Sequence, residues 1–387
     1  MGKKMRFYKL VFFIFLLIVT SSSNAQNIDF EVSTIIHNES EWMHGRNGLK
    51  SAPKDKNSFN SLYINLLTHY DINENIFLSF GAKANRVLGE NNYDMPIYLR
   101  SKPSSNDINK EIISEASINY DDGFYAFNIG RQEVNYDWLL GNIDGILAMI
   151  GRDESYSLRL FWFDEYQHLQ YNYYTHVKNI NAGRGMYGAI AKANLNELEL
   201  SFFNYLVEDL RNIAGTHLSY IYKNFGFNFS YSSAKALSQA LYTYDESFIN
   251  TSIEYLKGTH FYEFGYSKTG KNGLLAMLQM GNFMFGQFYL SNQVDRENAQ
   301  NIFLKYIYAN DKWRFELIGG KTKYDNSFVQ IENSMDSYEL DSYIKYNYSK
   351  NVSFDLGAMY MNVDERDPLQ VDQTLMMFNM VVNYESY

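Results

Sequence analysis

The chain has 387 residues and a net charge of −10, with 34 tyrosines, 28 phenylalanines, four prolines and no cysteine. Without cysteine there is no disulfide framework, and the negative charge argues against nucleic acid as a partner, because phosphate binding needs a basic surface. The mean hydropathy is −0.36 although aromatic residues make up 17% of the chain. This composition is typical of a barrel whose strands alternate between lipid and a wet lumen.

The first residues have the pattern of a secretory signal. Four basic residues precede the apolar run 10–19, and a small polar stretch ends at Ala25. Basic residues, a short apolar run and a small-residue cleavage site are the parts of a signal peptide. The run is shorter than the roughly 20 apolar residues that a spanning helix needs. We expect residues 1–25 to be cleaved, with an uncleaved anchor as the alternative, and residues 26–387 to form one domain.

Segments that alternate apolar and polar residues follow along the rest of the chain. In residues 76–84, Leu78 and Phe80 share one face, while Ser79 and Lys83 lie on the other. A period of two predicts a strand with one apolar and one polar face. Counting such segments gives about 18 strands, with roughly 16–20 possible. The least certain segment is 271–300, which is either an extra hairpin or a loop that packs inside.

The connections between these segments alternate in length. Short turns are expected near 71–74, 121–123, 152–155, 194–196, 257–259, 310–311 and 350–351. Longer polar connections are expected near 43–58, 89–110, 168–184, 271–300, 325–336 and 365–371. Outer-membrane barrels combine tight periplasmic turns with longer outer loops, and a soluble sandwich has no reason for this asymmetry. The sequence therefore predicts an all-β fold, a transmembrane antiparallel up-and-down barrel in the bacterial outer membrane.

The last segment of the chain also fits this class. It alternates through Met376, Phe378 and Met380 and closes on the aromatic Tyr387, although Tyr387 lies off the face that carries Tyr384. A terminal amphipathic strand that closes on an aromatic residue resembles the recognition signal of the barrel-assembly machinery. We therefore expect that machinery to be a partner during biogenesis.

The sequence contains no pattern that favours an enzyme or a metal site. None of the seven histidines has the spacing of a zinc site, and there is no Gly-x-Ser-x-Gly. Both patterns are the usual sequence signs of such chemistry. We expect no catalytic residue, no bound metal and no cofactor.

The polar faces of the predicted strands carry charges of both signs. Charged side chains that line a pore sort solutes by sign. Parity places these candidates in the lumen: Lys83, Glu115, Arg159, Glu263, Lys305, Arg314, Glu316 and Asp341. We predict a porin that passes small hydrophilic and charged solutes by diffusion through a constricted lumen. For each single residue, the alternative is an ordinary solvated position in a wide channel.

The segment 127–146 breaks the alternation. Its apolar parity reaches Ile129 and then continues to Arg131. An arginine that faces lipid at mid-membrane costs about 2–4 kcal/mol. Arg131 therefore lies at the rim, or a bulge at Gly130 turns it into the pore. Residues 133–142 then form an outer loop, and no helix follows that would offer its N-terminus to a phosphate.

This segment resembles the early strands of the outer-membrane porin D and alginate-export families. The shared pattern is a strand that ends in Gly130, Arg131 and Gln132, a loop, and a returning Asp-Gly-hydrophobic strand. Overall, the chain is similar to the Opr family porins of Gram-negative bacteria. The resemblance implies a barrel of about 18 strands whose third and seventh outer loops narrow the pore. It also implies a basic path for anionic solutes, for which the candidates are Arg131, Arg159 and Arg314.

On this count the third loop is 133–142 and the seventh is 271–300. The constriction candidates are Tyr136, Trp138, Leu275, Met280 and Phe283. The third loop is short and arginine does not dominate the predicted wall, and both features depart from the family pattern.

Two further functions remain open at this point. An exporter of an acidic, alginate-like polysaccharide requires basic residues clustered in the lumen. An outer-membrane enzyme or adhesin requires a catalytic group at one rim or a plugged pore. The partners expected for a porin are outer-membrane lipid and lipopolysaccharide, small hydrophilic solutes and, in a monomer or trimer, further copies of the chain.

Overall fold

The structure is a computed structural model of the whole chain. It describes residues 28–44, 56–91, 108–109, 111–152, 154–167, 169–170, 173–175, 178–237, 245–274, 288, 292–326, 334–367 and 372–386. The expected signal peptide, residues 1–25, lies outside the described residues.

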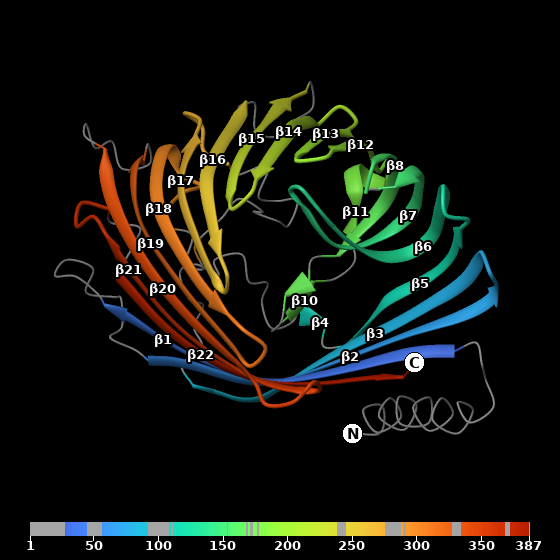
Figure 1. Cartoon of the computed structure of the whole chain (residues 1–387), viewed down its shortest axis with the longest axis horizontal. Helices are drawn as coiled ribbons and strands as arrows, with labels where there is room; N and C mark the ends of the chain where they lie inside the picture. Colours follow the sequence, from blue (N-terminus) through green and yellow to red (C-terminus); the bar gives the residue numbers. More distant parts are fainter. Residues whose placement is uncertain are drawn as a thin grey trace.

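The described chain forms one closed antiparallel barrel (Figure 1). Its sheet contains 19 strands, of which β11 (Lys178–Asn179) is a two-residue segment beside β8, and the other 18 form the wall. The wall strands are β1 (Ile28–His44), β2 (Lys56–Asn73), β3 (Ile76–Asn91), β5 (Glu111–Asp121), β6 (Tyr125–Tyr136), β7 (Leu139–Arg152), β8 (Tyr156–Gln167), β12 (Met186–Leu195), β13 (Leu198–Val207), β14 (Arg211–Tyr222), β15 (Phe225–Ala236), β16 (Glu246–Lys257), β17 (His260–Thr269), β18 (Glu297–Ala309), β19 (Trp313–Asp325), β20 (Met335–Asn347), β21 (Val352–Val363) and β22 (Asp372–Ser386).

The ring is closed by its first and last strands. β1 pairs with β22 from Phe30↔Ser386 to His44↔Asp372 and with β2 on its other side. Every wall strand therefore has a neighbour on both sides, which removes the unpaired edges that promote aggregation in open sheets. The predicted fold class and the predicted count of 18 strands are confirmed.

The two faces of the wall differ as the period of two predicts. Large apolar side chains project outward, for example Phe264, Leu304 and Leu340, each more than half exposed. The residues between them point inward and include the buried Ser267 and Asp341. Because side chains alternate across a strand, the same strand supplies an apolar outer face and a polar inner face.

The two ends of the barrel differ in their connections. The short-turn end has connections at 74–75, 122–124, 153–155, 196–197, 223–224, 258–259, 310–312 and 348–351. The long-loop end has connections at 45–55, 92–110, 137–138, 168–185, 208–210, 237–245, 270–296, 326–334 and 364–371. The predicted alternation of short and long connections is present, but the sequence analysis did not predict the connections at 208–210, 223–224 and 237–245. It also left open an extra hairpin within 271–300, whereas β17 and β18 pair directly and no wall strand lies between them.

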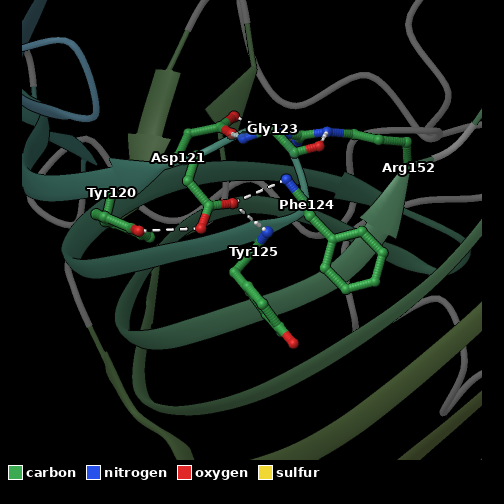
Figure 2. A network of polar contacts seen from close by, with 7 residues as sticks. Tyr120, Asp121, Gly123, Phe124, Tyr125 and Arg152 are labelled. Atoms are coloured by element: carbon green, nitrogen blue, oxygen red, sulfur yellow. Dashed lines mark hydrogen bonds and ion pairs between the residues drawn. The ribbon is translucent and has the colours of Figure 1, made fainter.

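The turn between β5 and β6 shows how the short-turn end is held (Figure 2). The carboxylate of Asp122 accepts backbone N–H groups from Phe124 at 2.8 Å and Tyr125 at 2.7 Å, and the Tyr120 hydroxyl donates to it at 3.0 Å. The two backbone donors hold the pKa of the Asp122 carboxyl below its ordinary value. Arg152, at the end of β7, pairs with Asp121 and donates to the Gly123 carbonyl. These contacts join three consecutive strands.

A small second sheet joins two of the long connections. It pairs β10 (Tyr173–Thr175) with β4 (Ile108–Asn109) and with β9 (Leu169–Gln170). The labels of β10 and β4 lie within the outline of the ring in Figure 1. In the described part of the chain, no helix is long and apolar enough to cross a membrane.

Candidate functional site

The hairpin between β6 and β7 leaves the wall before it turns. Pairing of β5 with β6 runs from Asp121↔Ala126 to Ala116↔Arg131 and stops there. Pairing of β6 with β7 continues to Tyr136↔Leu139. The segment 133–142 is therefore a paired hairpin and not the outer loop that was predicted from the sequence. We call this segment the inner hairpin, and Figure 1 shows it turned into the ring.

The tip of the inner hairpin lies against distant strands of the wall. Trp138 is fully buried, and its Nε1 donates a hydrogen bond of 2.9 Å to the Ser232 hydroxyl on β15. Its ring meets the Phe248 ring on β16 edge to face at 5.8 Å. In the order of the sheet, β8, β12, β13 and β14 lie between β7 and β15. The hairpin therefore spans part of the barrel interior.

Apolar side chains on the inner wall hold the inner hairpin in place. Tyr136 stacks on Phe161 of β8 at 5.9 Å, and Phe161 stacks on Phe163 at 4.4 Å. Aromatic pairs at such distances stabilise packing beyond the area they bury. The cluster also includes Val134, Leu139, Ile143, Met186, Ile190, Phe203, Tyr205, Val207, Ile213, Ala234 and Phe248. This cluster was not predicted from the sequence. The signal for it is the apolar residues at the inward-facing positions 161, 163, 203 and 205, where a wet lumen would favour polar residues.

The connection between β17 and β18 also enters the barrel interior. Its Leu274, Phe288 and Val294 are buried in the same cluster as the inner hairpin. The backbone N–H of Asn292 donates to Glu339 Oε2 on β20 at 2.7 Å, and the Thr269 hydroxyl donates to the Val294 carbonyl at 2.6 Å. These contacts join both flanks of the connection to the inner wall. The predicted constriction residues Leu275, Met280 and Phe283 lie outside the described residues.

A cavity of about 950 Å³ lies beside the inner hairpin. Asn135, Tyr136 and Asp137 of the hairpin line one side, and inward residues of β8 and of β12 to β19 line the other. Its charged or ionisable lining residues are Asp137, Arg159, Lys192, Glu199, His217, Glu254, Glu263, Lys305 and Arg314. Serine and asparagine side chains lie between them on β13, β15 and β16. The lining therefore offers donors and acceptors to a polar solute.

Three basic residues of this lining, Lys192, Lys305 and Arg314, are paired with acids on the same or a neighbouring strand. Lys192 pairs with Glu199 at 2.9 Å. Glu316 pairs with Lys305 at 3.1 Å and with Arg314 at 2.9 Å. Arg159 lies over the Tyr136 ring, 5.8 Å from its centroid. These pairs reduce the field that the cations present to a solute.

Of the remaining predicted pore residues, Lys83 and Glu115 lie on the far side of the hairpin. Lys83 on β3 forms an ion pair with Glu133, which joins the base of the inner hairpin to a strand two places from β6 in the wall. Glu115 lies on β5 beside a register shift at Gly81/Ala82 of β3. Glu263 is 8% exposed and lies opposite Lys305 in the β17–β18 register.

Acids dominate another sector of the inner wall. Asp341 on β20 is buried and lies one inward position from the buried Glu339. Asp355 on β21, with Glu39 and Glu41 on β1, extends this sector round the ring. The sequence analysis placed Asp341 in the lumen by parity but did not predict this acidic sector around it.

Arg131 lies at the base of the inner hairpin and does not line the cavity. Its Nε donates to Asp144 at 2.8 Å, its Nη2 pairs with the same carboxylate, and Glu165 lies 3.7 Å away. Its Nη1 also lies 3.4 Å from the Ile113 carbonyl, beyond the point where β6 leaves β5. Pairing on both sides of Gly130 has no register shift, so the bulge offered as one alternative is absent.

Glycines allow the bend at this base. Gly130 has a φ of +124°, and a Cβ there would lie 2.3 Å from the Ala116 carbonyl oxygen. Gly145 lies directly opposite Gly130 in the pairing. A Cβ on Gly145 would lie 2.1 Å from the Trp162 carbonyl oxygen. Only glycine fits where two backbones approach this closely.

Among the described residues, no group of three or more His, Cys, Asp or Glu side chains could hold a metal ion.

Comparison with known proteins supports the architecture. No family model and no curated protein sequence matches the chain. Among solved structures, OccAB1 from Acinetobacter baumannii matches with a TM-score of 0.75 and 12% identity, over 94% of this chain and 99% of that one. The outer membrane protein OpdK from Pseudomonas aeruginosa matches with a TM-score of 0.72 and 10% identity, over 94% and 100%. A structure of OpdK with vanillate matches with a TM-score of 0.73 and 9% identity, over 94% and 100%. At these identities the likeness concerns the fold, and the chain shares its 18-stranded antiparallel barrel with these proteins.

Proposed function

We propose that the chain is a porin of the bacterial outer membrane, through which small hydrophilic solutes diffuse. The observation that carries the proposal is the cavity of about 950 Å³, which has a charged and polar lining inside a closed barrel with an apolar outer face. A polar lumen and an apolar outer band are the two requirements of a barrel that conducts through lipid. Similarity in fold to the outer membrane protein OpdK supports the same proposal.

The location follows from the outer face of the barrel. Isoleucine, leucine and phenylalanine side chains project outward on strands all round the ring, for example Ile118, Phe202 and Leu356. An apolar surface of this extent would aggregate in water. We propose that lipid covers it, that residues 1–25 direct export, and that the long-loop end faces the outside of the cell.

The narrow part of the pathway is proposed to be the inner hairpin together with the connection between β17 and β18. Both segments place side chains inside the barrel, and Trp138 and Val294 belong to one apolar cluster. A loop that folds into a barrel reduces the cross-section open to solutes. Passage would then depend on the size of the solute and on the charges beside the hairpin.

We further propose a weak preference for cations over anions. Three cations of the cavity lining lie beside acids, in the Lys192–Glu199 pair and in the pairs of Glu316 with Lys305 and Arg314. The rest of the inner wall carries additional acids such as Asp341 and Asp355. Rings of acidic side chains favour cations in a pore. This sign is opposite to the basic path that the family resemblance implies.

Planar-bilayer recording tests both statements. The purified chain is expected to open discrete channels, and a salt gradient is expected to give a reversal potential of the sign for cation preference. Protein that has been unfolded by heating before addition is the control. Absence of channels from the folded protein would refute the porin, while channels with an anion-type potential would refute only the cation preference.

A further inference from the structure

Three lysines lie together on the outward face at the long-loop end of the barrel. Lys268 is on β17, and Lys321 and Lys323 are on β19. The register pairs Lys268 with Gln300 of β18, and Gln300 with Lys323. We call Lys268, Lys321 and Lys323 the lysine triad.

The neighbours of the triad establish which way it faces. Ser267, Thr269 and Thr322, which alternate with the lysines along their strands, are buried on the inner side. The Lys321 side chain is 48% exposed, and its Nζ lies 5.1 Å from the centroid of the outward Tyr338 ring. Lys268 and Lys323 are also exposed. All three side chains therefore project toward the surroundings of the barrel.

The triad lies directly next to the apolar outer band. Ile302, which pairs with Lys321, is 53% exposed, and Phe264, four residues before Lys268, is 54% exposed. Leu304, the next outward residue of β18, is 59% exposed. The lysines are thus at the level where acyl chains end and polar head groups begin.

The spacing suits one multiply charged anion. Strands two apart in a sheet are separated by about 10 Å, and alternate residues of a strand by about 7 Å. A lysine side chain extends about 6 Å, so the ammonium groups of Lys268 and Lys323 can converge on phosphates placed over Gln300. The ammonium group of Lys321 lies on the β20 side of β19, against Asp336 and Tyr338. The nearby acids are partly engaged, because Asp336 pairs with Lys321 at 3.1 Å and Asp325 accepts a hydrogen bond from Asn298 at 2.8 Å. Within the described residues, neither Lys268 nor Lys323 forms an ion pair.

We propose that the lysine triad binds the phosphate groups of a phosphorylated glycolipid of the outer leaflet, that is, lipopolysaccharide. The inference rests on the proposed function, which places the long-loop end outside the cell. Lysine binds phosphate by charge-assisted hydrogen bonds, and these strengthen beside a lipid surface that excludes water. Lys268 and Lys323 supply charge on either side of Gln300, and Lys321, paired with Asp336, adds the third ammonium group beside them.

The test compares two triple variants that remove the same charge. Lys268→Ala, Lys321→Ala and Lys323→Ala together remove the triad. Lys257→Ala, Lys312→Ala and Lys350→Ala together remove three exposed lysines at the short-turn end. Delipidated protein in detergent is titrated with lipopolysaccharide, and native mass spectrometry counts the bound glycolipid. The same glycolipid after enzymatic dephosphorylation and inorganic phosphate as a competitor complete the series.

The triad variant is expected to bind lipopolysaccharide on the order of tenfold more weakly than the wild type. The control variant should match the wild type, and the dephosphorylated glycolipid should bind the wild type as weakly as lipopolysaccharide binds the triad variant. Equal binding by the triad variant and the wild type would overturn the proposal. An equal loss in the control variant would do so too, and so would displacement by millimolar phosphate. Channel conductance of both variants is recorded in parallel. If the triad variant conducts like the wild type and also binds lipopolysaccharide like the wild type, the triad proposal is refuted and the porin proposal stands.

Discussion

The indole N–H of Trp138, at the tip of the inner hairpin, is hydrogen-bonded at 2.9 Å to the hydroxyl of Ser232, on a strand that lies five places away in the wall. Both side chains are fully buried inside the barrel. This bond and the Phe248 ring fix the position of the hairpin tip. On the proposed function, the width of the pathway is therefore expected to change when Trp138 is replaced.

Trp138→Ala is expected to raise single-channel conductance, because the tip loses its contacts with β15 and β16. Truncating a buried tryptophan costs about 3–5 kcal/mol, so the unfolding midpoint in urea should also fall. Trp313→Ala is the matched control, since Trp313 is 46% exposed on the outward face. Unchanged conductance in Trp138→Ala would show that the tip does not limit flow.

Replacing Arg131, Arg159 and Arg314 together by alanine tests the basic path. Arg159 and Arg314 line the cavity, so their loss should shift the reversal potential toward stronger cation preference. Arg131→Ala alone is expected to leave selectivity unchanged, because Arg131 is paired with Asp144 outside the cavity lining. If the triple variant keeps the ion selectivity of the wild type, the basic-path hypothesis is wrong.

Glu316→Gln should move selectivity in the other direction. Its carboxylate neutralises Lys305 and Arg314 at 3.1 and 2.9 Å, so the amide would leave two cations uncompensated beside the cavity. The expected result is a reversal potential displaced toward anions at low salt, with a smaller displacement at 1 M salt, where the Debye length is about 3 Å. Glu154→Gln, in a short turn, is the control, and an equal displacement in that variant would argue for a general surface-charge effect.

Asp364, in the connection between β21 and β22, should contribute stability that depends on pH. Its hydrogen bond with the Arg366 guanidinium is the main cause that lowers its pKa to about 2, against an ordinary value of 3.8. A carboxyl with a lowered pKa stabilises the folded state above its ordinary pKa and loses that effect as pH falls through the lower value. Asp364→Asn should therefore unfold at a lower temperature than the wild type at pH 7, and the gap should narrow as the pH falls from 3.8 through about 2.

The adjacent exposed Glu365 supplies the control for this measurement. Glu365→Gln is expected to follow the wild type at every pH. A gap between Asp364→Asn and the wild type that is as large at pH 2 as at pH 7 would contradict the assignment, because much of the Asp364 carboxyl is then protonated.

Gly130→Ala is expected to weaken the wall where the inner hairpin departs. The φ of +124° and the Ala116 carbonyl 2.3 Å from the added Cβ both oppose alanine. Strain of this kind costs about 1–3 kcal/mol. The measure is the fraction that keeps its folded mobility in an electrophoretic gel at rising temperature. Gly89→Ala is the control, because the nearest atom to its Cβ would be 3.9 Å away, and equal behaviour of both variants would remove the steric argument.

The strands of the wall were predictable from the sequence because the signals that define them lie within short segments of the chain. Alternation in segments such as 76–84 depends only on which face each side chain takes, and turn residues such as Asp121 and Gly123 have a conformational signature of their own. Missed connections, such as 208–210, are so short or so mixed in composition that neither signal stands out. The pattern therefore gave the strand number correctly despite errors in individual connections.

The barrel interior was less predictable because it depends on contacts between distant segments. Arg131 follows the outward parity of its strand, but its partners Asp144 and Glu165 lie on two other strands. The ion pair of Lys83 with Glu133 also joins residues that are 50 positions apart. The inner hairpin was read as a loop because polar residues and glycine in 133–142 suggested a connection, whereas backbone pairing carries both strands through it.

The pairing of β1 with β22 has a consequence for how the molecule is made. β1 is synthesised first and β22 last, so a growing chain that has not yet reached β22 has two unpaired strand edges. Contacts between residues so far apart in sequence form slowly, and unpaired strand edges pair readily with other chains before the ring closes. Completion of the ring is thus a late event, because the edge of β1 gains its second neighbour only when β22 has been made.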